Sequence, residues 1–476
     1  MKQKSAKSLA ELSTKTFIQV VALLFALMLV SIVLTYVIPK GSFDLHPDGT
    51  VDYLAYRRIE GAKGIPIWKG LLAPVLVFFS SNGLTLLMLS LFLLVIFGAF
   101  QVMNDVGGIR VLVGAVSLRF QKRRALLLCA ISLIFMCFGA FLGQFEEMLT
   151  MLPIVTALCV LVGYDSFTGF LVCIIACGFG FASAITNPFT VLLASRIIDA
   201  NPLTHIWYRV VIFVVMYLLL LGFVFLYVRK LKKDPKNSLT FTHDEKLRSA
   251  GVETEQTIDE TSARRIKRSY IVFLLVCLAL LITCSAVSAL RDYTVPVLIA
   301  FFLIFGVVVG IIASKTVRPV FRSFGNGVVG ALPTIVFIAL ASSVKYIFDE
   351  GSIMPTIVHS INTVVTGRNP FIIVLVLYAI ILVLEFFISS STAKAILVMG
   401  MLAVVNVGLT KQMLVLIYTF ADGYTNVLFP TSPVLLIGLS MIEIDYFKWV
   451  KKSAPLFLVN LALVLLFLFL GIVIGY

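Results

Sequence analysis

A polar segment inside an otherwise apolar stretch constrains this chain more than any other feature. Residues 419–433 read TFADGYTNVLFPTSP and lie between the apolar runs MLVLIY and VLLIGLSMI. A helix facing lipid does not carry such a segment, because Gly423 and the two prolines break its hydrogen-bond ladder and leave backbone groups unsatisfied in hydrocarbon. Broken backbone at membrane depth is tolerated where it lines a polar cavity, which in secondary transporters is the substrate and ion site.

A second segment of the same kind lies in the first half of the chain. Residues 178–190 read GFGFASAITNPFT, again between apolar runs, and their Thr186-Asn187 corresponds to Thr425-Asn426. Each segment follows a long apolar stretch with a polar middle, GQFEE within residues 125–162 and SSST within residues 371–407. The chain is therefore predicted to contain one unit twice, an interrupted apolar hairpin followed by a helix broken at Thr-Asn.

The composition is that of a membrane protein built from helices. Hydrophobic residues make up 60% of the 476 residues and charged residues 13%, and the mean hydropathy is +1.06. Many runs exceed the roughly 20 apolar residues that span a bilayer, and the period-2 alternation of a membrane β-barrel is missing. The four histidines and seven cysteines show no metal-binding spacing. We expect an all-α polytopic membrane protein without a metal centre of His or Cys.

The basic residues predict the topology. The net charge of +14 is concentrated in loops, which indicates membrane orientation rather than nucleic-acid binding. Residues 229–268 hold eleven Lys and Arg against seven Asp and Glu, and they are expected to form a flexible cytoplasmic linker. Four lysines predict a cytoplasmic N-terminus at the inner membrane: Lys2, Lys4, Lys7 and Lys15.

An odd number of predicted crossings separates the two units. One unit then enters from the cytoplasm and the other from outside, so the two form an inverted repeat whose breaks meet near the midplane. The predicted parts are first-repeat scaffold helices (1–124), first hairpin and broken helix (125–200), connecting helix and cytoplasmic loop (201–268), second-repeat scaffold helices (269–370), second hairpin and broken helix (371–442), and a C-terminal helix (443–476).

Oxygen-bearing side chains gather in both breaks and at the second hairpin tip. They are Ser183, Thr186, Asn187, Ser389, Ser390, Ser391, Thr392, Thr425, Asn426 and Thr431. Na⁺ prefers oxygen ligands and half-helix C-termini, whereas half-helix N-termini suit a substrate carboxylate. The candidate Na⁺ ligands are Ser183, Asn187, Ser390 and Asn426. The alternatives are that the coupling ion is H⁺, or that these side chains only cap half-helices and join helices.

Ionisable residues inside apolar stretches are costly and are functional by default. Glu146, Glu147 and Asp422 are expected to coordinate a cation, accept a proton or pair with a substrate amine. Three roles are open for Lys394: pairing with Asp422, holding a substrate carboxylate, or replacing a coupling cation with its fixed ammonium. A purely structural Lys394–Asp422 pair is the alternative. Glu385 is a further ionisable residue of this kind, and the alternative for it is that it only reaches the aqueous vestibule.

Several motifs resemble those of the YfcC family of bacterial permeases, which is related to the anaerobic C4-dicarboxylate carriers within the ion transporter superfamily. They are GQFEEMLTMLP at 143–153, GYDS at 163–166, ASAITNPFTVLLA at 182–194, FFISSSTAKA at 386–395, and ADGYTNVLFPTSP at 421–433 with IEIDYFKWVK after it. Their order and spacing extend through nearly the whole chain.

The resemblance implies an elevator-type transporter, usually a homodimer, in which a transport domain moves against a scaffold. Hairpin tips and broken helices would enclose the site. The residues that fall on the family's acidic, Asn-Pro and DG-x-TN…PTS motifs are Glu146, Glu147, Asn187, Asp422, Thr425, Asn426 and Thr431. Lys394 and Pro433 depart from the pattern. Family members are linked to the exchange of basic amino acids, such as arginine for ornithine, and to related carboxylates.

Exchange of basic amino acids is the leading functional hypothesis, because acidic side chains lie at the tips. Ion-coupled transport of C4-dicarboxylates or other small organic anions is the alternative. An intramembrane enzyme would need a nucleophile and base or a metal set, and the sequence shows neither. A channel is the third class, against which two opposed hairpins argue. The expected partners are a small-molecule substrate, the lipid bilayer and a second copy of the chain.

Overall fold

The computed structural model describes residues 14–45, 47, 51–61, 64–81, 83–112, 114, 123–245, 259–287, 290, 293–365, 368–388, 391–404 and 408–476. Within these ranges, eight helices are long and apolar enough to cross a membrane. They are α1 (Thr14–Val37), α4 (Gly83–Asp105), α6 (Arg124–Cys137, continued by a π-helix to Leu142), α11 (Ile206–Lys233), α13 (Glu260–Ala286), α15 (Thr294–Ser314), α16 (Arg318–Glu350) and α23 (Tyr446–Ile474). The polytopic helical architecture predicted from the sequence is confirmed.

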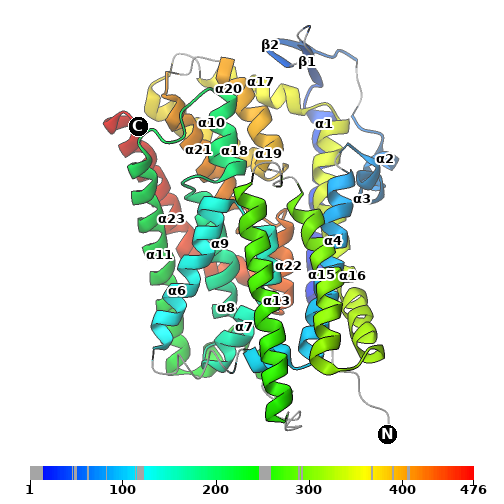
Figure 1. Ribbon diagram of the computed structural model, residues 1–476. Helices are drawn as coiled ribbons and strands as arrows, with labels where there is room; N and C mark the ends of the chain where they lie inside the picture. Colours follow the sequence, from blue (N-terminus) through cyan, green and yellow to red (C-terminus); the bar gives the residue numbers. More distant parts are fainter. Residues whose placement is uncertain are drawn as a thin grey trace.

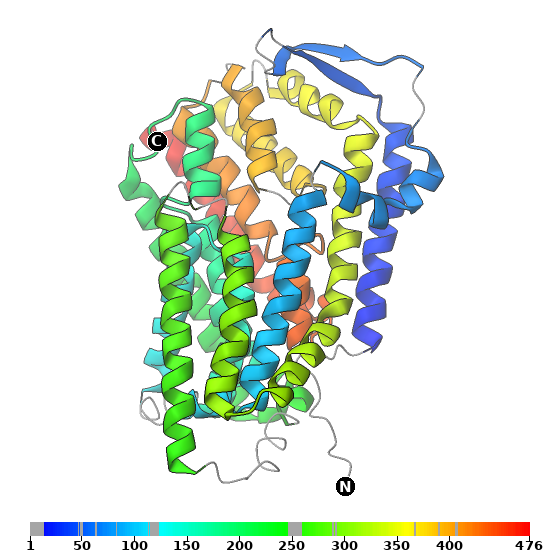
Figure 2. The ribbon, with the colours of Figure 1, turned by 45° about the vertical axis from the view of Figure 1, so that its right-hand side comes forward.

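Helices α1, α4, α15 and α16 pack side by side along one flank of the molecule (Figure 1, Figure 2). Glycines bring their backbones together: a Cβ on Gly327 of α16 would lie 2.4 Å from the Phe97 carbonyl oxygen of α4. Gly306 and Gly310 of α15 likewise face α4, so their G-x-x-x-G spacing serves packing within the chain. We call these four helices the flank group.

The first predicted unit is a helical hairpin followed by a broken helix. After α6 and its π-helix, residues 143–145 are non-helical, and the chain returns through α7 (Leu152–Leu161). The broken helix runs through α8 (Ser166–Phe170), a π-helix and α9 (Ala176–Ala182), is interrupted at residues 183–187, and resumes through a second π-helix into α10 (Leu193–Ile197).

The second unit repeats this order. Helix α18 (Pro370–Glu385), α19 (Ser391–Lys394), a π-helix and α20 (Gly400–Val404) form the hairpin, and α21 (Lys411–Thr425) and α22 (Pro433–Met441) form the broken helix. Figure 1 shows the first hairpin, α6 and α7, in the lower half of the molecule and the second, α18 to α20, in the upper half. The two hairpins therefore approach the middle from opposite ends.

The first break is held by the hairpin beside it. The carbonyl oxygen of Ala140 accepts hydrogen bonds from the backbone N–H groups of Ile185 and Thr186, at 3.1 and 3.2 Å. Ala140 lies in the π-helix Phe138–Leu142, where the wider turn leaves carbonyls free for such partners. The neighbouring Gly139 carbonyl accepts from Asn187 Nδ2 at 3.0 Å. Backbone freed by the break is thus satisfied inside the protein, as hydrocarbon requires.

The two broken helices cross where they break. A Cβ on Gly423, near the end of α21, would lie 2.1 Å from the Cα of Ala182, the last residue of α9. Gly178 makes room for Val427 in the same way, and the rings of Phe179 and Tyr424 meet edge to face at 5.2 Å. Glycine allows this approach because it has no side chain.

Two short strands depart from the expected all-α fold. Strands β1 (Gly41–Leu45) and β2 (Val51–Arg58) pair antiparallel and lie above α17 (Met354–Val365) in Figure 2. On β2, Tyr56 stacks on His359 of α17 with ring centroids 4.2 Å apart, and the Tyr53 hydroxyl donates to the Ile396 carbonyl at 3.2 Å. The two strands contain too few apolar residues for a membrane span, and for this reason their sequence predicts a polar loop.

Part of the expected flexible linker is packed against the first unit. Two oxygens of Asp244 accept hydrogen bonds from Ser166 and Thr240, and Asp165 accepts from Ser238 at 2.7 Å. Burial raises the pKa of the Asp244 carboxyl, and the Ser166 hydrogen bonds oppose that rise. Residues 229–245 are therefore ordered, and residues 246–258 lie outside the described ranges.

Replacing Gly180 with alanine tests the contact between hairpin and broken helix. The new Cβ would lie 1.9 Å from the Met136 carbonyl oxygen, so backbone must shift. We expect a loss of about 1–3 kcal/mol in the free energy of unfolding, the usual range for overpacking. Gly222→Ala in α11 is the matched control, because nothing lies within 4 Å of its Cβ. Thermal unfolding in detergent measures both, and equal midpoints would contradict the contact.

Candidate functional site: a buried ammonium between two carboxylates

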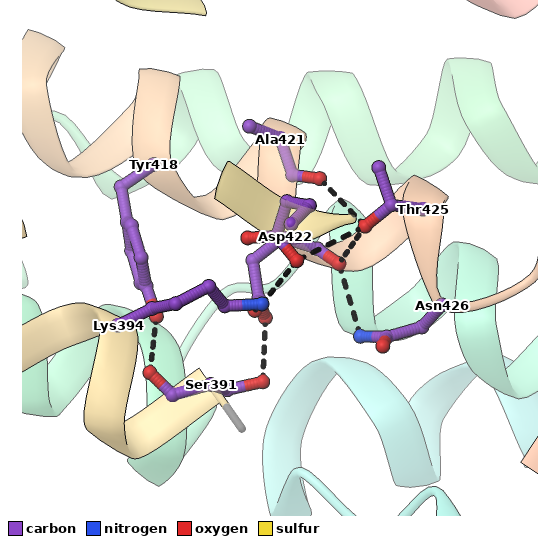
Figure 3. Close-up of polar contacts among 8 residues, drawn as sticks. Ser391, Lys394, Tyr418, Ala421, Asp422, Thr425 and Asn426 are labelled. Atoms are coloured by element: carbon purple, nitrogen blue, oxygen red, sulfur yellow. Dashed lines mark hydrogen bonds and ion pairs between the residues drawn. The ribbon is translucent and has the colours of Figure 1, made fainter. Parts of the chain in front are cut away.

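The Lys394 ammonium lies between two carboxylates in the second unit. Its side chain is fully buried, and its Nζ contacts Glu385 Oε2 and lies 2.7 Å from Asp422 Oδ1. Figure 3 shows the lysine reaching from the hairpin toward Asp422 on the broken helix. Both carboxylates are buried too, with 3% and 0% of Glu385 and Asp422 exposed. Opposite charges at this spacing attract strongly where water is excluded.

The two carboxylates of the cluster lie at the C-terminal ends of helices. Glu385 is the last residue of α18, and Asp422 lies in the last turn of α21. A helix C-terminus carries about half a negative charge, so two helix ends and two carboxylates surround one ammonium. Lys394 follows Ser391 by three residues in α19, which places both on one face of that helix.

Hydroxyl groups complete the cluster. Ser391 Oγ donates to Asp422 Oδ2 at 2.8 Å, and Thr425 Oγ1 lies 3.2 Å from Glu385 Oε2. Thr425 and Asn426 also bond to the Asp422 carbonyl oxygen, both at 2.9 Å, which satisfies backbone freed at the end of α21. The Tyr418 hydroxyl donates to the Ser391 carbonyl and so ties the hairpin to the broken helix.

Glu385 is buried and ion-paired with Lys394. Of the two interpretations offered by the sequence, the one in which Glu385 only reaches the aqueous vestibule is wrong. Its position nine residues before Lys394, across a hairpin tip, gives no helical periodicity that would connect the two. A simpler feature of the sequence could have predicted this pair. An acidic and a basic residue in neighbouring apolar segments both need a partner of opposite charge, and each is the nearest such partner of the other.

Two candidate side chains of the first unit, those of Ser183 and Asn187, form hydrogen bonds to backbone groups. Ser183 Oγ donates to the Phe179 carbonyl at 2.6 Å. Asn187 Oδ1 accepts from the backbone N–H groups of Phe189 and Thr190, while its Nδ2 bonds to Gly139. These contacts cap the half-helices, as the alternative interpretation predicted. Thr186 is half-buried beside them.

The remaining candidates are more scattered. Glu146 is exposed and Glu147 half-buried at the first tip, and among the described residues no ion pair joins either to Lys394. Thr392 is exposed at the second tip, and Thr431 is buried in the second break. Ser389 and Ser390 lie outside the described residues. Five candidates therefore meet in the cluster: Ser391, Lys394, Asp422, Thr425 and Asn426.

The cluster holds one more acid than base. Two carboxylates face one ammonium, so the group carries one net negative charge when all three are ionised. Glu385 Oε1 accepts no hydrogen bond from the described residues. Among those residues, no group of three or more His, Cys, Asp or Glu forms that could hold a metal ion.

The sequence matches a known family over almost its whole length. The family model described as C4-dicarboxylate anaerobic carrier, DcuC, matches residues 17–473. The chain belongs to this family. It is a multi-pass membrane transporter, and the resemblance to carriers of this kind predicted from the motifs is confirmed.

Two bacterial proteins are similar to this chain over most of its length. The chain is 27% identical over 472 residues, 91% of this chain and 92% of the relative, to YfcC of Escherichia coli (strain K12), provisionally named as a basic amino acid antiporter. It is 24% identical over 369 residues, 77% of this chain and 71% of the relative, to an uncharacterized protein of Haemophilus influenzae (strain ATCC 51907 / DSM 11121 / KW20 / Rd).

Solved structures of transporters are distant. MtrF of Neisseria gonorrhoeae, described with a class of antimetabolite efflux pumps, aligns with 94% of each chain at 13% identity and a TM-score of 0.44. The YdaH transporter of Alcanivorax borkumensis aligns with 96% of this chain and 99% of its own at 15% identity and a TM-score of 0.41.

Substituting Lys394 alone should destabilise the protein, because it leaves two buried carboxylates uncompensated. We expect Lys394→Met to lower the free energy of unfolding by about 3–5 kcal/mol. Adding Glu385→Gln and Asp422→Asn removes the stranded charges, so the triple variant should recover most of this loss. Unfolding curves in mixed micelles measure the three proteins. A triple variant less stable than Lys394→Met would show that the charges do not act as one group.

Proposed function

We propose that this DcuC-family transporter exchanges basic amino acids, of the arginine and ornithine type, across the inner membrane. The observation that carries the proposal is the surplus of carboxylate over ammonium in the buried cluster, where the two broken helices cross. A net negative site attracts a cationic substrate and disfavours an anionic one. The name of the Escherichia coli relative agrees with this substrate class.

The half-helices supply a complementary end for the substrate. Helix α22 begins at Pro433 directly after the second break, and its N-terminus carries partial positive charge. Such an end suits the carboxylate of an amino acid, while the acidic cluster suits its cationic groups. A zwitterion with one extra positive charge would therefore be matched at both ends.

An exchange assay in proteoliposomes tests the substrate. Vesicles loaded with unlabelled ornithine should accumulate labelled arginine faster than empty vesicles, because an obligate exchanger needs a substrate on both sides. Glu385→Gln should reduce this exchange, because it removes the surplus negative charge. Failure of arginine, lysine and ornithine to exchange under all conditions would contradict the proposal.

Transport of C4-dicarboxylates is the second candidate, favoured by the description of the matching family. It requires Lys394 to leave one of its carboxylates and bind a substrate carboxylate instead. Accumulation of a labelled dicarboxylate in the same vesicles, without accumulation of arginine, would select this function.

We further propose that the two hairpins and broken helices move as a transport domain against the flank group. In support, among the described residues the aromatic contact that crosses this boundary is the stacking of Phe348 of α16 on Phe387 of the second hairpin, with ring centroids 4.2 Å apart. The interior of the proposed domain is instead joined through backbone, at Ala140 and Ala182.

A disulfide between positions 348 and 387 tests this motion in a cysteine-free background. The pair joins α16 to the second hairpin tip, so cross-linking should stop exchange and reduction should restore it. The matched control joins Phe17 of α1 to Phe337 of α16, whose rings lie 5.4 Å apart within the flank group. Exchange that survives the 348–387 cross-link would contradict the motion.

The homodimer implied by the family resemblance is also a proposal. Light scattering of the purified protein should give twice the 52.4 kDa mass of one chain, after correction for bound detergent. A mass of one chain would contradict it.

A further inference from the structure

The surroundings of Lys394 have the chemistry of a site for a free monovalent cation. The carboxylates of Glu385 and Asp422, each at the C-terminal end of a helix, contact its ammonium, and the hydroxyls of Ser391 and Thr425 lie against these carboxylates. Broken-helix transporters use half-helix C-termini and freed carbonyl oxygens to coordinate Na⁺. Here that place is taken by an ammonium that belongs to the chain.

We propose that Lys394 is a tethered cation that fills a coupling-cation site, so that the protein works without binding Na⁺ or K⁺ there. This inference rests on the proposed exchange function only in its statement that transport does not require Na⁺ or K⁺ at this site. The site itself is argued from the contacts of Lys394 with Glu385 and Asp422, whatever the substrate.

The geometry supports a permanent rather than an exchangeable cation. Lys394 is fully buried, Asp422 accepts a further hydrogen bond from the Ser391 hydroxyl at 2.8 Å, and the Thr425 hydroxyl lies 3.2 Å from Glu385 Oε2. A free ion entering the site would have to displace an ammonium held at 2.7 Å from Asp422. Because the lysine is covalently attached, its effective concentration at the site is far above that of ions in solution.

The tether also connects the two elements that a coupling ion would join. Lys394 comes from the second hairpin, whereas Asp422 comes from the second broken helix. A free cation in this place would fix the hairpin to the broken helix only while bound. The lysine fixes them permanently, which suits an exchanger whose transport domain crosses only when substrate is present.

Removing the ammonium should uncover the ion site. In Lys394→Ala the truncated side chain leaves space between Glu385 and Asp422 that a free ion can occupy. Purified protein is titrated with NaCl at constant ionic strength, with choline chloride as the balancing salt. We expect the unfolding midpoint of Lys394→Ala to rise with Na⁺ by about 3 °C or more, because a ligand that binds only the folded state stabilises it.

Two controls make this titration specific. Lys345→Ala removes a lysine outside the cluster, whose Nζ lies 3.8 Å from Asp349, and its midpoint should not respond to Na⁺. The triple variant Lys394→Ala, Glu385→Gln, Asp422→Asn has the space without the carboxylates, and it should not respond either. A Na⁺ response equal in all variants would overturn the proposal, as would no response of Lys394→Ala.

The unmodified protein gives a second test that does not depend on the folding of any variant. Its midpoint should be the same in NaCl, KCl and choline chloride, and its arginine–ornithine exchange should keep its rate when choline replaces Na⁺ on both sides. Stabilisation of the unmodified protein by Na⁺, or loss of exchange without Na⁺, overturns the proposal. If no basic amino acid is exchanged under any condition, the proposed substrate is wrong, whereas the titration still decides the cation site.

Discussion

The backbone groups freed at the two breaks need hydrogen-bond partners inside the protein, and the structure depends on that constraint. The first break gives its freed N–H groups to the carbonyl of Ala140, which a π-helical turn leaves available. At the second break, the carbonyl oxygen of Asp422 accepts hydrogen bonds from the side chains of Thr425 and Asn426. Glycines at 139, 180 and 423 then allow the backbones to come close enough for these contacts. Satisfied breaks, rather than apolar packing alone, position the candidate site.

The buried charges follow from the same constraint. An ammonium in a low-dielectric interior is stable only when opposite charges surround it, and Lys394 has both Glu385 and Asp422. One carboxylate would be enough to neutralise the charge of Lys394, so the second carboxylate is additional. That second carboxylate is the basis of the proposal that the site binds a cationic substrate.

The repeated unit could be predicted because it leaves a strong local signal. Polar residues and prolines inside apolar runs gave hairpins over residues 125–162 and 371–407, close to the observed α6–α7 and α18–α20. Pairing of Lys394 with Asp422 was one of the predicted interpretations, and its role in transport stays a prediction. Contacts between residues far apart in the sequence were not predicted. They include the hydrogen bond from Tyr53 to the second hairpin and the packing of Asp244 against Ser166, and the burial of Glu385 was not predicted either. No periodicity in the chain relates these partners, since they are brought together only by the crossing of distant elements.

The central claim is that the two hairpins reach the middle of the membrane from opposite sides. It is tested most directly by single cysteines at Arg123 and Arg368, both exposed at the outer ends of the two hairpins, in a cysteine-free background. In intact cells, a membrane-impermeant maleimide should label only the cysteine at 368, and the cysteine at 123 should react only after the membrane is opened. Labelling of both positions from the same side would contradict the inverted arrangement and, with it, the shared site at the crossing of the broken helices.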